Sequence, residues 1–237
     1  MFAGIARRYD AANNAISFGL HRGWKRLLVS DPALRSGARV LDCACGTGDV
    51  AFEALQRVLP SGEVIGIDFT PEMIELAKLK TARLSDSWLQ VPGETELAVD
   101  AIRFEVGDIL HLPYPDGHFN AATIAFGIRN VDDPERGIAE MARVVKSGGS
   151  VLVLESGMPP SKLWRAIYGI YQSSALWIIG GVLSGNIAAY RYLADTTKRF
   201  PSGGEFEMLM QGAAGFRSIT ATPLLGGVAY IYRGVVA

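Results

Sequence analysis

Short apolar runs recur along the chain, and segments of helical character lie between them. The apolar runs cover residues 38–42, 63–68, 102–108, 120–126 and 150–155. The helical segments lie near residues 48–59, 71–84 and 134–146. Uninterrupted Val, Ile and Leu runs that alternate with helices of this length are typical of parallel strands covered on both faces. The pattern therefore predicts an α/β fold built on a doubly wound, mostly parallel sheet.

The rest of the chain departs from this alternation. Two further β-like runs lie within residues 218–236, and Gly226–Gly227 separates them, which predicts a hairpin at an antiparallel edge of the sheet. Residues 1–35, before the first strand, are mostly of helical character. Residues 85–101 are polar and rich in turn-forming residues, so we expect an exposed loop there.

One stretch is more apolar than the others, and the mean hydropathy of the chain is +0.19. Residues 166–190 carry no charge and are long enough to span a bilayer. Polar residues interrupt the stretch, and Gly180–Gly181 lies at its centre, which argues against a transmembrane helix. A buried helix pair is one alternative. The other is a helical lid over an apolar substrate that touches a membrane surface.

Composition narrows the class of protein. The 23 basic and 24 acidic residues nearly cancel, without a run of one sign, so no nucleic-acid partner is indicated. Two cysteines exclude a disulfide-rich secreted scaffold. Cys43 and Cys45 lack a second pair at metal-ligand spacing, so we predict no metal site. Residues 1–8 lack the features of a signal peptide, and we expect a cytoplasmic protein.

The strongest chemical feature is the segment DCACGTGD at residues 42–49, between the first strand and the helix after it. Gly46 and Gly48 let the chain turn sharply and let a ligand approach the main chain. The segment has neither the third glycine of a dinucleotide-binding loop nor the lysine of a P-loop. Asp68 and Asp108 follow the next two strands. Each acid alone could be a helix cap or a loop salt bridge, but the set indicates a ligand at the carboxyl ends of the strands.

A strand ending in an acid, a G-x-G turn and a second strand ending in an acid resemble the S-adenosylmethionine site of class I methyltransferases. The resemblance implies that Asp42 and the glycine loop hold the methionine part of the cofactor. It implies that Asp68 binds both ribose hydroxyls through charge-assisted hydrogen bonds. It also implies that Asp108 contacts the adenine amino group, with Ile109 beside the ring. Ala44 stands where the class usually has glycine.

Four segments resemble the signature segments of the ubiquinone/menaquinone biosynthesis C-methyltransferase family. They are YDAANNAISFGLHRGW (9–24), FGIRNVDDP (126–134), RVVKSGGSVLVLES (143–156) and YRYLADT (190–196). The similarity covers roughly residues 5–234. Ala12, where the family usually has Met, and a long 85–101 segment depart from the pattern and leave the subfamily open.

This resemblance implies transfer of a methyl group from S-adenosylmethionine to a ring carbon of a prenylated quinol precursor. The family's known acceptors are demethylmenaquinol and a methoxy-benzoquinol with a polyprenyl tail. The predicted cofactor contacts are Asp42, Gly46, Thr47, Gly48, Asp68, Phe69, Asp108, Ile109 and Ala125. Ala125 stands where relatives often have Ser, so a hydroxyl contact is lost there. Residues 70–72 (TPE) begin the next helix, with Thr70 as its N-cap.

Methylation of an aromatic carbon needs an electron-rich ring, which ionisation of an ortho phenolic hydroxyl supplies. Arg129 and Asn130 follow the fourth strand. A guanidinium is always charged, so Arg129 would stabilise the phenolate or order a water that acts as the base. Asn130 would hydrogen-bond the quinol oxygen. Histidine suits a general base, and His21 is either that base or a structural histidine that packs near Trp24.

We expect a single methyltransferase domain. Its expected parts are an N-terminal helical lid (1–35), a cofactor-binding core (36–155), an apolar helical substrate lid (156–203) and a C-terminal helix with edge strands (204–237). Tyr9 would close over the site, and Tyr190 and Arg191 would face the quinol head. Peripheral contact with the inner face of a membrane and a homodimer both stay open.

Two other functions stay open as well. A methyltransferase acting on another small apolar acceptor, such as a sterol or a fatty acid, would share the cofactor loop but not the signature segments. A catalytically silent S-adenosylmethionine-binding subunit would also share the loop, although the intact FGIRN segment at 126–130 argues against it. The choice between a benzoquinol and a naphthoquinol acceptor also stays open.

Overall fold

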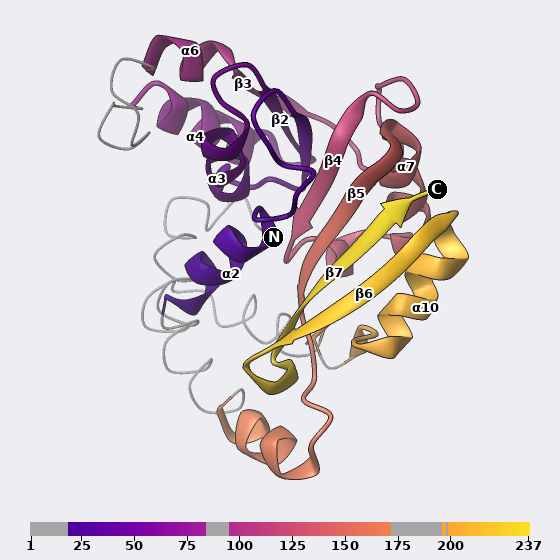
Figure 1. Ribbon diagram of the computed structural model, residues 1–237. Helices are drawn as coiled ribbons and strands as arrows, with labels where there is room; N and C mark the ends of the chain where they lie inside the picture. The colour runs from indigo at the N-terminus through magenta and orange to yellow at the C-terminus, as the bar shows by residue number, and fades with distance from the viewer. Residues whose placement is uncertain (1–18, 84–94, 172–195, 198) are drawn as a thin grey trace.

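The computed structural model describes residues 19–83, 95–171, 196–197 and 199–237 (Figure 1). Tyr9, Tyr190 and Arg191, which the sequence assigns to the substrate site, lie outside the described residues, as does most of the 166–190 stretch. Among the described residues, no helix is both long and apolar enough to cross a membrane.

A seven-stranded sheet forms the centre of the described structure, in the order β3-β2-β1-β4-β5-β7-β6. The strands are β1 (Arg39–Cys43), β2 (Glu63–Asp68), β3 (Ile102–Val106), β4 (Phe119–Ala125), β5 (Val145–Ser156), β6 (Phe216–Leu224) and β7 (Ala229–Val236). Strands β1 to β5 pair in parallel, and β7 pairs antiparallel with both β5 and β6. The predicted fold class is confirmed, including the antiparallel edge.

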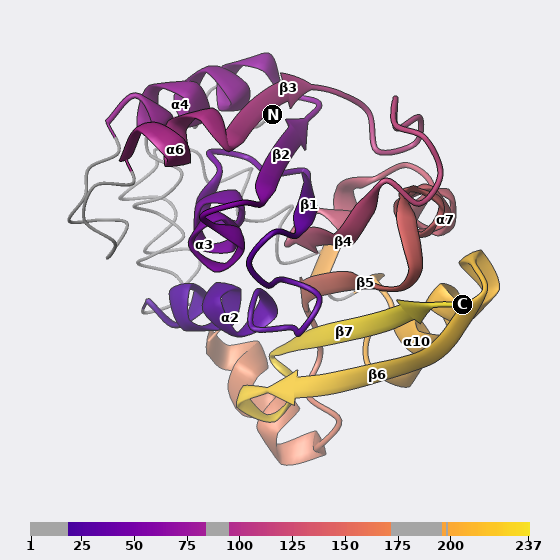
Figure 2. The same cartoon turned by 45° about the horizontal axis from the view of Figure 1, so that its top comes forward.

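Helices cover both faces of the sheet, as Figures 1 and 2 show. They are α2 (Leu20–Leu28), α3 (Asp49–Val58), α4 (Pro71–Thr81), α6 (Thr95–Asp100), α7 (Pro134–Val144) and α10 (Gly204–Ala213). Neighbouring strand residues point to opposite faces, so Val40 packs in one core cluster with α2, α3, α4 and α6. Leu41 packs in the other cluster, with α7 and α10. This double burial is why the parallel strands read as apolar runs.

The C-terminal hairpin turns through a short 3-10 segment, η3 (Leu225–Gly227). Gly226 and Gly227 both have positive φ, 66° and 98°. A backbone in this region strongly favours glycine, so the two glycines identified in the sequence are the residues that the turn requires.

Two local predictions were wrong in detail. Residues 95–100 form α6, with Ala98 fully buried, whereas an exposed loop was predicted there. The helix predicted to reach 146 ends at Val144, because β5 begins at Val145. The prediction of Thr70 as the N-cap of α4 is confirmed, although its side chain makes no capping hydrogen bond. The helix begins with Pro71 at its first position and a backbone hydrogen bond from Met73 N to Thr70 O.

The strand order determines where a ligand site can lie. Chain connections run outward in opposite directions from β1 and β4, which are neighbours in the sheet. The loop after β1 leads to α3 on one face, and the loop after β4 leads to α7 on the other. Such a reversal leaves a crevice at the carboxyl ends of the strands, where open α/β sheets bind their ligands.

Candidate active site

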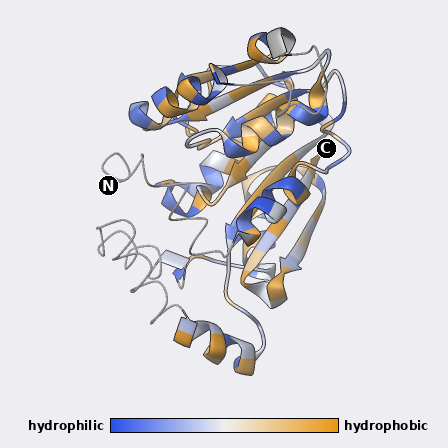
Figure 3. Cartoon of the chain, turned by 90° about the vertical axis from the view of Figure 1, so that its left-hand side faces the viewer, coloured by the Kyte–Doolittle hydropathy of each residue, from blue (hydrophilic) through white to orange (hydrophobic). Residues whose placement is uncertain are grey.

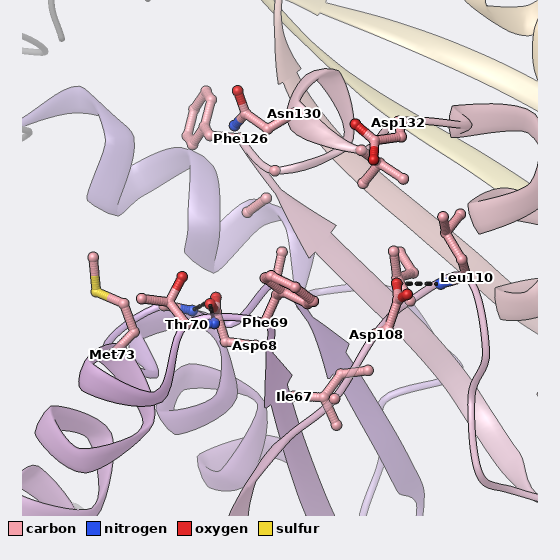
Figure 4. A pocket seen from close by; sticks show the side chains of 17 residues that line it. Ile67, Asp68, Phe69, Thr70, Met73, Asp108, Leu110, Phe126, Asn130 and Asp132 are labelled. Carbon is pink, nitrogen blue, oxygen red and sulfur yellow. Dashed lines mark hydrogen bonds between the residues drawn. The ribbon is translucent and has the colours of Figure 1, made fainter. Parts of the chain in front are cut away.

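A cavity of about 380 Å³ lies at this reversal point (Figure 4). Four loops line it, one after each of β1, β2, β3 and β4. Its lining includes Ala44 and Gly46, residues 67–70, Met73, residues 107–110, residues 125–127 and residues 130–132. Seven sequence-predicted site residues are therefore brought together here, namely Gly46, Asp68, Phe69, Asp108, Ile109, Ala125 and Asn130.

The carboxylate of Asp68, at the end of β2, is oriented by two backbone N–H groups. Gly46 N donates to Oδ2 at 2.8 Å and Thr70 N donates to Oδ1 at 2.9 Å. An ionised carboxylate has about four acceptor positions, so each oxygen keeps room for a further donor. The first bond also ties the glycine loop after β1 to the end of β2.

Asp108, in the loop after β3, is oriented in a similar way. Leu110 N donates to its Oδ1 at 2.9 Å, and His111 Nδ1 lies 3.5 Å from its Oδ2. His111 Nε2 lies 2.7 Å from Arg136 Nη2. Because a guanidinium only donates, Nε2 accepts in this pair and the imidazole proton sits on Nδ1, facing Asp108. The sequence did not reveal this contact, since His111 lies on a polar turn with no motif around it.

The glycine loop is open toward the cavity. Gly46 has φ 56°, and a Cβ added to it would meet no atom within 4 Å. Ala44 also adopts a left-handed φ of 48°, a conformation in which a non-glycine residue is strained. A Cβ added to Gly127 would lie 2.7 Å from the Cβ of Ala44, so the methyl group at 44 fits because position 127 is glycine.

Asp42 lies behind the loop rather than on the cavity wall. It faces Thr123 across the β1–β4 pair, and the Thr123 hydroxyl donates to its Oδ1 at 2.7 Å. Its Oδ2 is buried and without a hydrogen-bond partner. Burial raises the pKa of Asp42 to about 7, although the Thr123 hydroxyl and the charge of Lys25 act in the opposite direction. The carboxyl is therefore poised to accept a positively charged or hydrogen-bonding group.

Two lysines hold the start of α3. Lys25 of α2 and Lys80 of α4 approach the two carboxylate oxygens of Asp49 at 2.8 and 3.0 Å. Burial alone would raise the pKa of Asp49, but the two ammonium groups outweigh it and lower the pKa. Lys80 also donates to Thr47 Oγ1 at 2.7 Å. Thr47 and Gly48, both predicted cofactor contacts, thus lie in a segment fixed from α2 and α4.

The segment after β4 is held by a buried ion pair. Arg129 Nη1 donates to Glu155 Oε1, and the two side chains are only 7% and 1% exposed. The backbone N of Ser156 and its hydroxyl also donate to Glu155 Oε1, at 2.7 and 2.9 Å. Arg129 itself does not line the cavity, whereas the next residue, Asn130, does (Figure 4). The pair thereby fixes the turn, η2 (Ile128–Asn130), that presents Asn130.

Glu155 is the partner that sequence reasoning missed. It lies at the end of β5, 26 residues from Arg129, and the two meet because β4 and β5 are neighbours. His21 of α2 is buried and does not line the cavity. Among the described residues, three buried side-chain atoms have no hydrogen-bond partner, Asp42 Oδ2, Arg129 Nε and Ser150 Oγ. Two of the three belong to sequence-predicted site residues, and such atoms often mark functional groups.

These residues fit S-adenosylmethionine on structural grounds. The glycine at 46 keeps the space beside it empty, two oriented carboxylates flank the cavity, and Asp42 has an unpartnered buried oxygen beneath the loop. Phe69, 77% exposed, and Ile109 supply apolar surface on the same wall. Acceptors for hydroxyl and amino groups beside apolar surface match a nucleoside.

Solved structures show the same fold. The chain aligns with an S-adenosylmethionine-dependent methyltransferase from Thermotoga maritima, described as a possible histamine N-methyltransferase, over 100% of this chain and 98% of that one, with TM-score 0.64 and 19% identity. A second such methyltransferase, from Aquifex aeolicus, aligns over 86% and 85% of the two chains with TM-score 0.58 and 17% identity. Fold and site together define a class I methyltransferase.

The sequence comparisons are more specific. The model of the ubiE/COQ5 methyltransferase family matches residues 1–236. A ubiquinone/menaquinone biosynthesis C-methyltransferase from Bdellovibrio bacteriovorus is 38% identical, covering 100% of this chain and 94% of the relative. A demethylmenaquinone methyltransferase from Deinococcus radiodurans is 43% identical, covering 92% and 84%. The chain belongs to the ubiE/COQ5 methyltransferase family and is an S-adenosylmethionine-dependent C-methyltransferase.

The substitution Asp42→Asn tests the buried carboxyl. Its folded-state pKa, about 7, lies above the unfolded value of 3.8, so the folded protein binds the extra proton between these values and loses stability as the pH rises through them. Relative to the wild type, the free energy of unfolding of the variant should rise by about 1–4 kcal/mol between about pH 4 and pH 7, then stay level. Urea unfolding of both proteins over this pH range measures the change. A difference in the free energy of unfolding that does not vary with pH would contradict a raised pKa at Asp42.

The substitution Glu155→Gln tests the buried ion pair. It leaves the Arg129 guanidinium buried without its counter-charge, so we expect a loss of about 3–5 kcal/mol in the free energy of unfolding. Glu75→Gln is the matched control, because Glu75 is 70% exposed and pairs with Lys78 on the surface, where such pairs contribute little. Equal, small losses in both variants by urea unfolding would show that the pair does not hold the turn.

Proposed function

We propose that this enzyme methylates a ring carbon of a prenylated quinol precursor in menaquinone or ubiquinone biosynthesis. The relatives' names support this reaction, since they are called demethylmenaquinone methyltransferase and ubiquinone/menaquinone biosynthesis C-methyltransferase. One observation carries the proposal. Asn130 lies on the wall of the same cavity as Asp68 and Asp108, held there by the Arg129–Glu155 pair. A nucleoside-binding wall and an amide that can bind a phenolic oxygen thus share one space.

Each acid has a proposed role in holding the cofactor, which when bound supplies an electrophilic methyl group on a sulfonium. Asp68 accepts from the ribose hydroxyls through the positions that Gly46 N and Thr70 N leave open. Asp108, fixed by Leu110 N, accepts from the adenine amino group. The free Oδ2 of Asp42 attracts the positively charged methionine part through the loop. Charge-assisted bonds of this kind are among the stronger ones in proteins.

The acceptor side rests on Asn130 and Arg129. Asn130 hydrogen-bonds the quinol oxygen next to the carbon that receives the methyl group, and this positions the carbon. The charge of Arg129 is matched by Glu155, but its Nε–H is buried without a partner. Because Arg129 does not line the cavity, this donor would stabilise the phenolate through an ordered water.

Incubation with labelled S-adenosylmethionine tests the reaction. Demethylmenaquinol and a methoxy-benzoquinol, each with a prenyl tail and solubilised in detergent, are supplied in separate reactions. We expect label on a ring carbon of at least one quinol, and the rates for the two show which ring the cavity accepts. Transfer to a sterol or fatty acid, with none to either quinol, would contradict the proposed acceptor. Cofactor binding without any transfer would indicate a silent subunit.

The substitution Asp68→Ala tests the cofactor assignment. Removing the carboxylate leaves the ribose hydroxyls without a charged acceptor, so we expect S-adenosylmethionine affinity to fall by about 1–3 kcal/mol in calorimetry. Asp116→Ala is the control, because Asp116 is an exposed aspartate that pairs with Arg143 on the surface. Unchanged affinity in Asp68→Ala, or an equal loss in both variants, would mean that Asp68 does not bind the cofactor.

A further inference from the structure

A helix at 162–171 projects from the end of the molecule, below the hairpin in the view of Figure 1. It leaves the sheet after the carboxyl end of β5, the edge at which the cavity lies. Trp164 Nε1 donates to Leu225 O at 2.9 Å. A Cβ added to Gly226 would lie 2.8 Å from Trp164 Nε1, so the indole packs directly on the turn. The helix and η3 therefore form one surface.

Apolar side chains form an exposed stripe on this surface. Leu163, Ile167 and Ile170 are 74%, 47% and 68% exposed. Their spacing of four and then three residues places them on one side of the helix. Leu225, on the adjoining turn, is 52% exposed. Figure 3 shows the helix apart from the main body, with hydrophobic positions along it. Contiguous exposed apolar residues of this kind mark interaction surfaces.

Aromatic residues accompany the stripe. Trp164, Tyr168 and Tyr171 repeat with the same spacing, one position along from the apolar residues, and the two tyrosine rings stack with centroids 6.1 Å apart. Tryptophan and tyrosine are enriched where a protein meets the boundary between lipid headgroups and water, because one end of each ring system is apolar and the other polar.

The charge of the segment has one sign. Residues 157–171 contain two basic residues, Lys162 and Arg165, and no acidic residue. Arg165 Nε donates to Pro159 O at 2.9 Å, which holds the guanidinium at the start of the helix. A helix with an apolar stripe, flanking aromatics and basic residues has the composition of one that lies in the surface of a membrane containing anionic lipids.

We propose that helix 162–171 and η3 dock this enzyme on the surface of an anionic lipid bilayer, with Leu163, Ile167 and Leu225 entering the headgroup region. The proposal rests on the proposed function, because a prenylated quinol resides in the bilayer and must reach a cavity at the same edge of the sheet. A second copy of this chain fits the surface less well. A two-fold contact through the same face would bring the basic residues of both copies together without an acid from 157–171.

Cosedimentation with vesicles tests the surface. The vesicles are equal parts phosphatidylcholine and phosphatidylglycerol in one arm and phosphatidylcholine alone in the other. We expect wild-type protein to bind the anionic vesicles more strongly, and the double variant Leu163→Ser/Ile167→Ser to lose about tenfold or more of that binding. The control Leu79→Ser/Met208→Ser removes two exposed apolar side chains from α4 and α10 and should bind like the wild type.

Three results would overturn the docking surface. One is an equal loss of vesicle binding in both double variants, and another is equal binding of the wild type to the two kinds of vesicle. The third is a wild-type dimer that the substitutions Leu163→Ser/Ile167→Ser convert to a monomer without loss of vesicle binding. Unchanged thermal unfolding and S-adenosylmethionine affinity show that the variants fold. Wild-type enzyme that methylates a detergent-solubilised quinol but ignores vesicles would refute the docking surface alone. Vesicle binding without methyl transfer to any quinol would refute only the proposed function.

Discussion

Parallel pairing of β1 with β2 and β4 is the constraint on which the site depends. The register sets Asp42 opposite Gly66 on one side and Thr123 on the other. The hydroxyl of Thr123 therefore lies beside the buried carboxyl of Asp42. Gly66 leaves room for the ring of Phe104, because a Cβ at position 66 would lie 2.5 Å from that ring. Because all these strands end at the same edge of the sheet, the loops that follow them come together there. A shift of one residue in this register would reverse which face each side chain occupies.

The acids Asp42, Asp49 and Glu155 are stabilised by different partners. Burial raises the pKa of Asp42, and the Thr123 hydroxyl and the more distant Lys25 ammonium offset only part of that rise. Asp49 is matched by two lysines, and its pKa is lowered. Glu155 is matched by a guanidinium and by the N–H and hydroxyl of Ser156. The best-compensated acids hold backbone in place, whereas Asp42 keeps an unsatisfied oxygen, as expected of a group whose partner arrives with a ligand.

Local patterns were sufficient to predict the strands, the hairpin and the acids at the strand ends. Asp68 and Asp108 each accept from the backbone N–H two residues ahead, a bond that residue type and position alone favour. Contacts between distant elements were beyond such reasoning. Glu155 on β5 meets Arg129, which follows the neighbouring strand β4, and Lys80 meets Thr47 from the far end of α4. Helix α6 was missed because it is only six residues long and its sequence, TELAVD, mixes polar with apolar residues, which gives little periodic signal.

The surplus of apolar residues can be understood from the same geometry. A substrate with a water-soluble ring and a long hydrocarbon tail needs a polar, oriented site for the ring and an apolar route for the tail. For the first, the cavity offers Asn130 beside Asp68 and Asp108, whose carboxylates are fixed by backbone N–H groups. The exposed stripe on helix 162–171 lies in the segment that follows β5, beyond Glu155 and Ser156. The strand whose Glu155 holds the turn that presents Asn130 is thus the strand that leads into the apolar helix. Under the proposed function, both the ring and the tail of the substrate would be bound at one edge of one sheet.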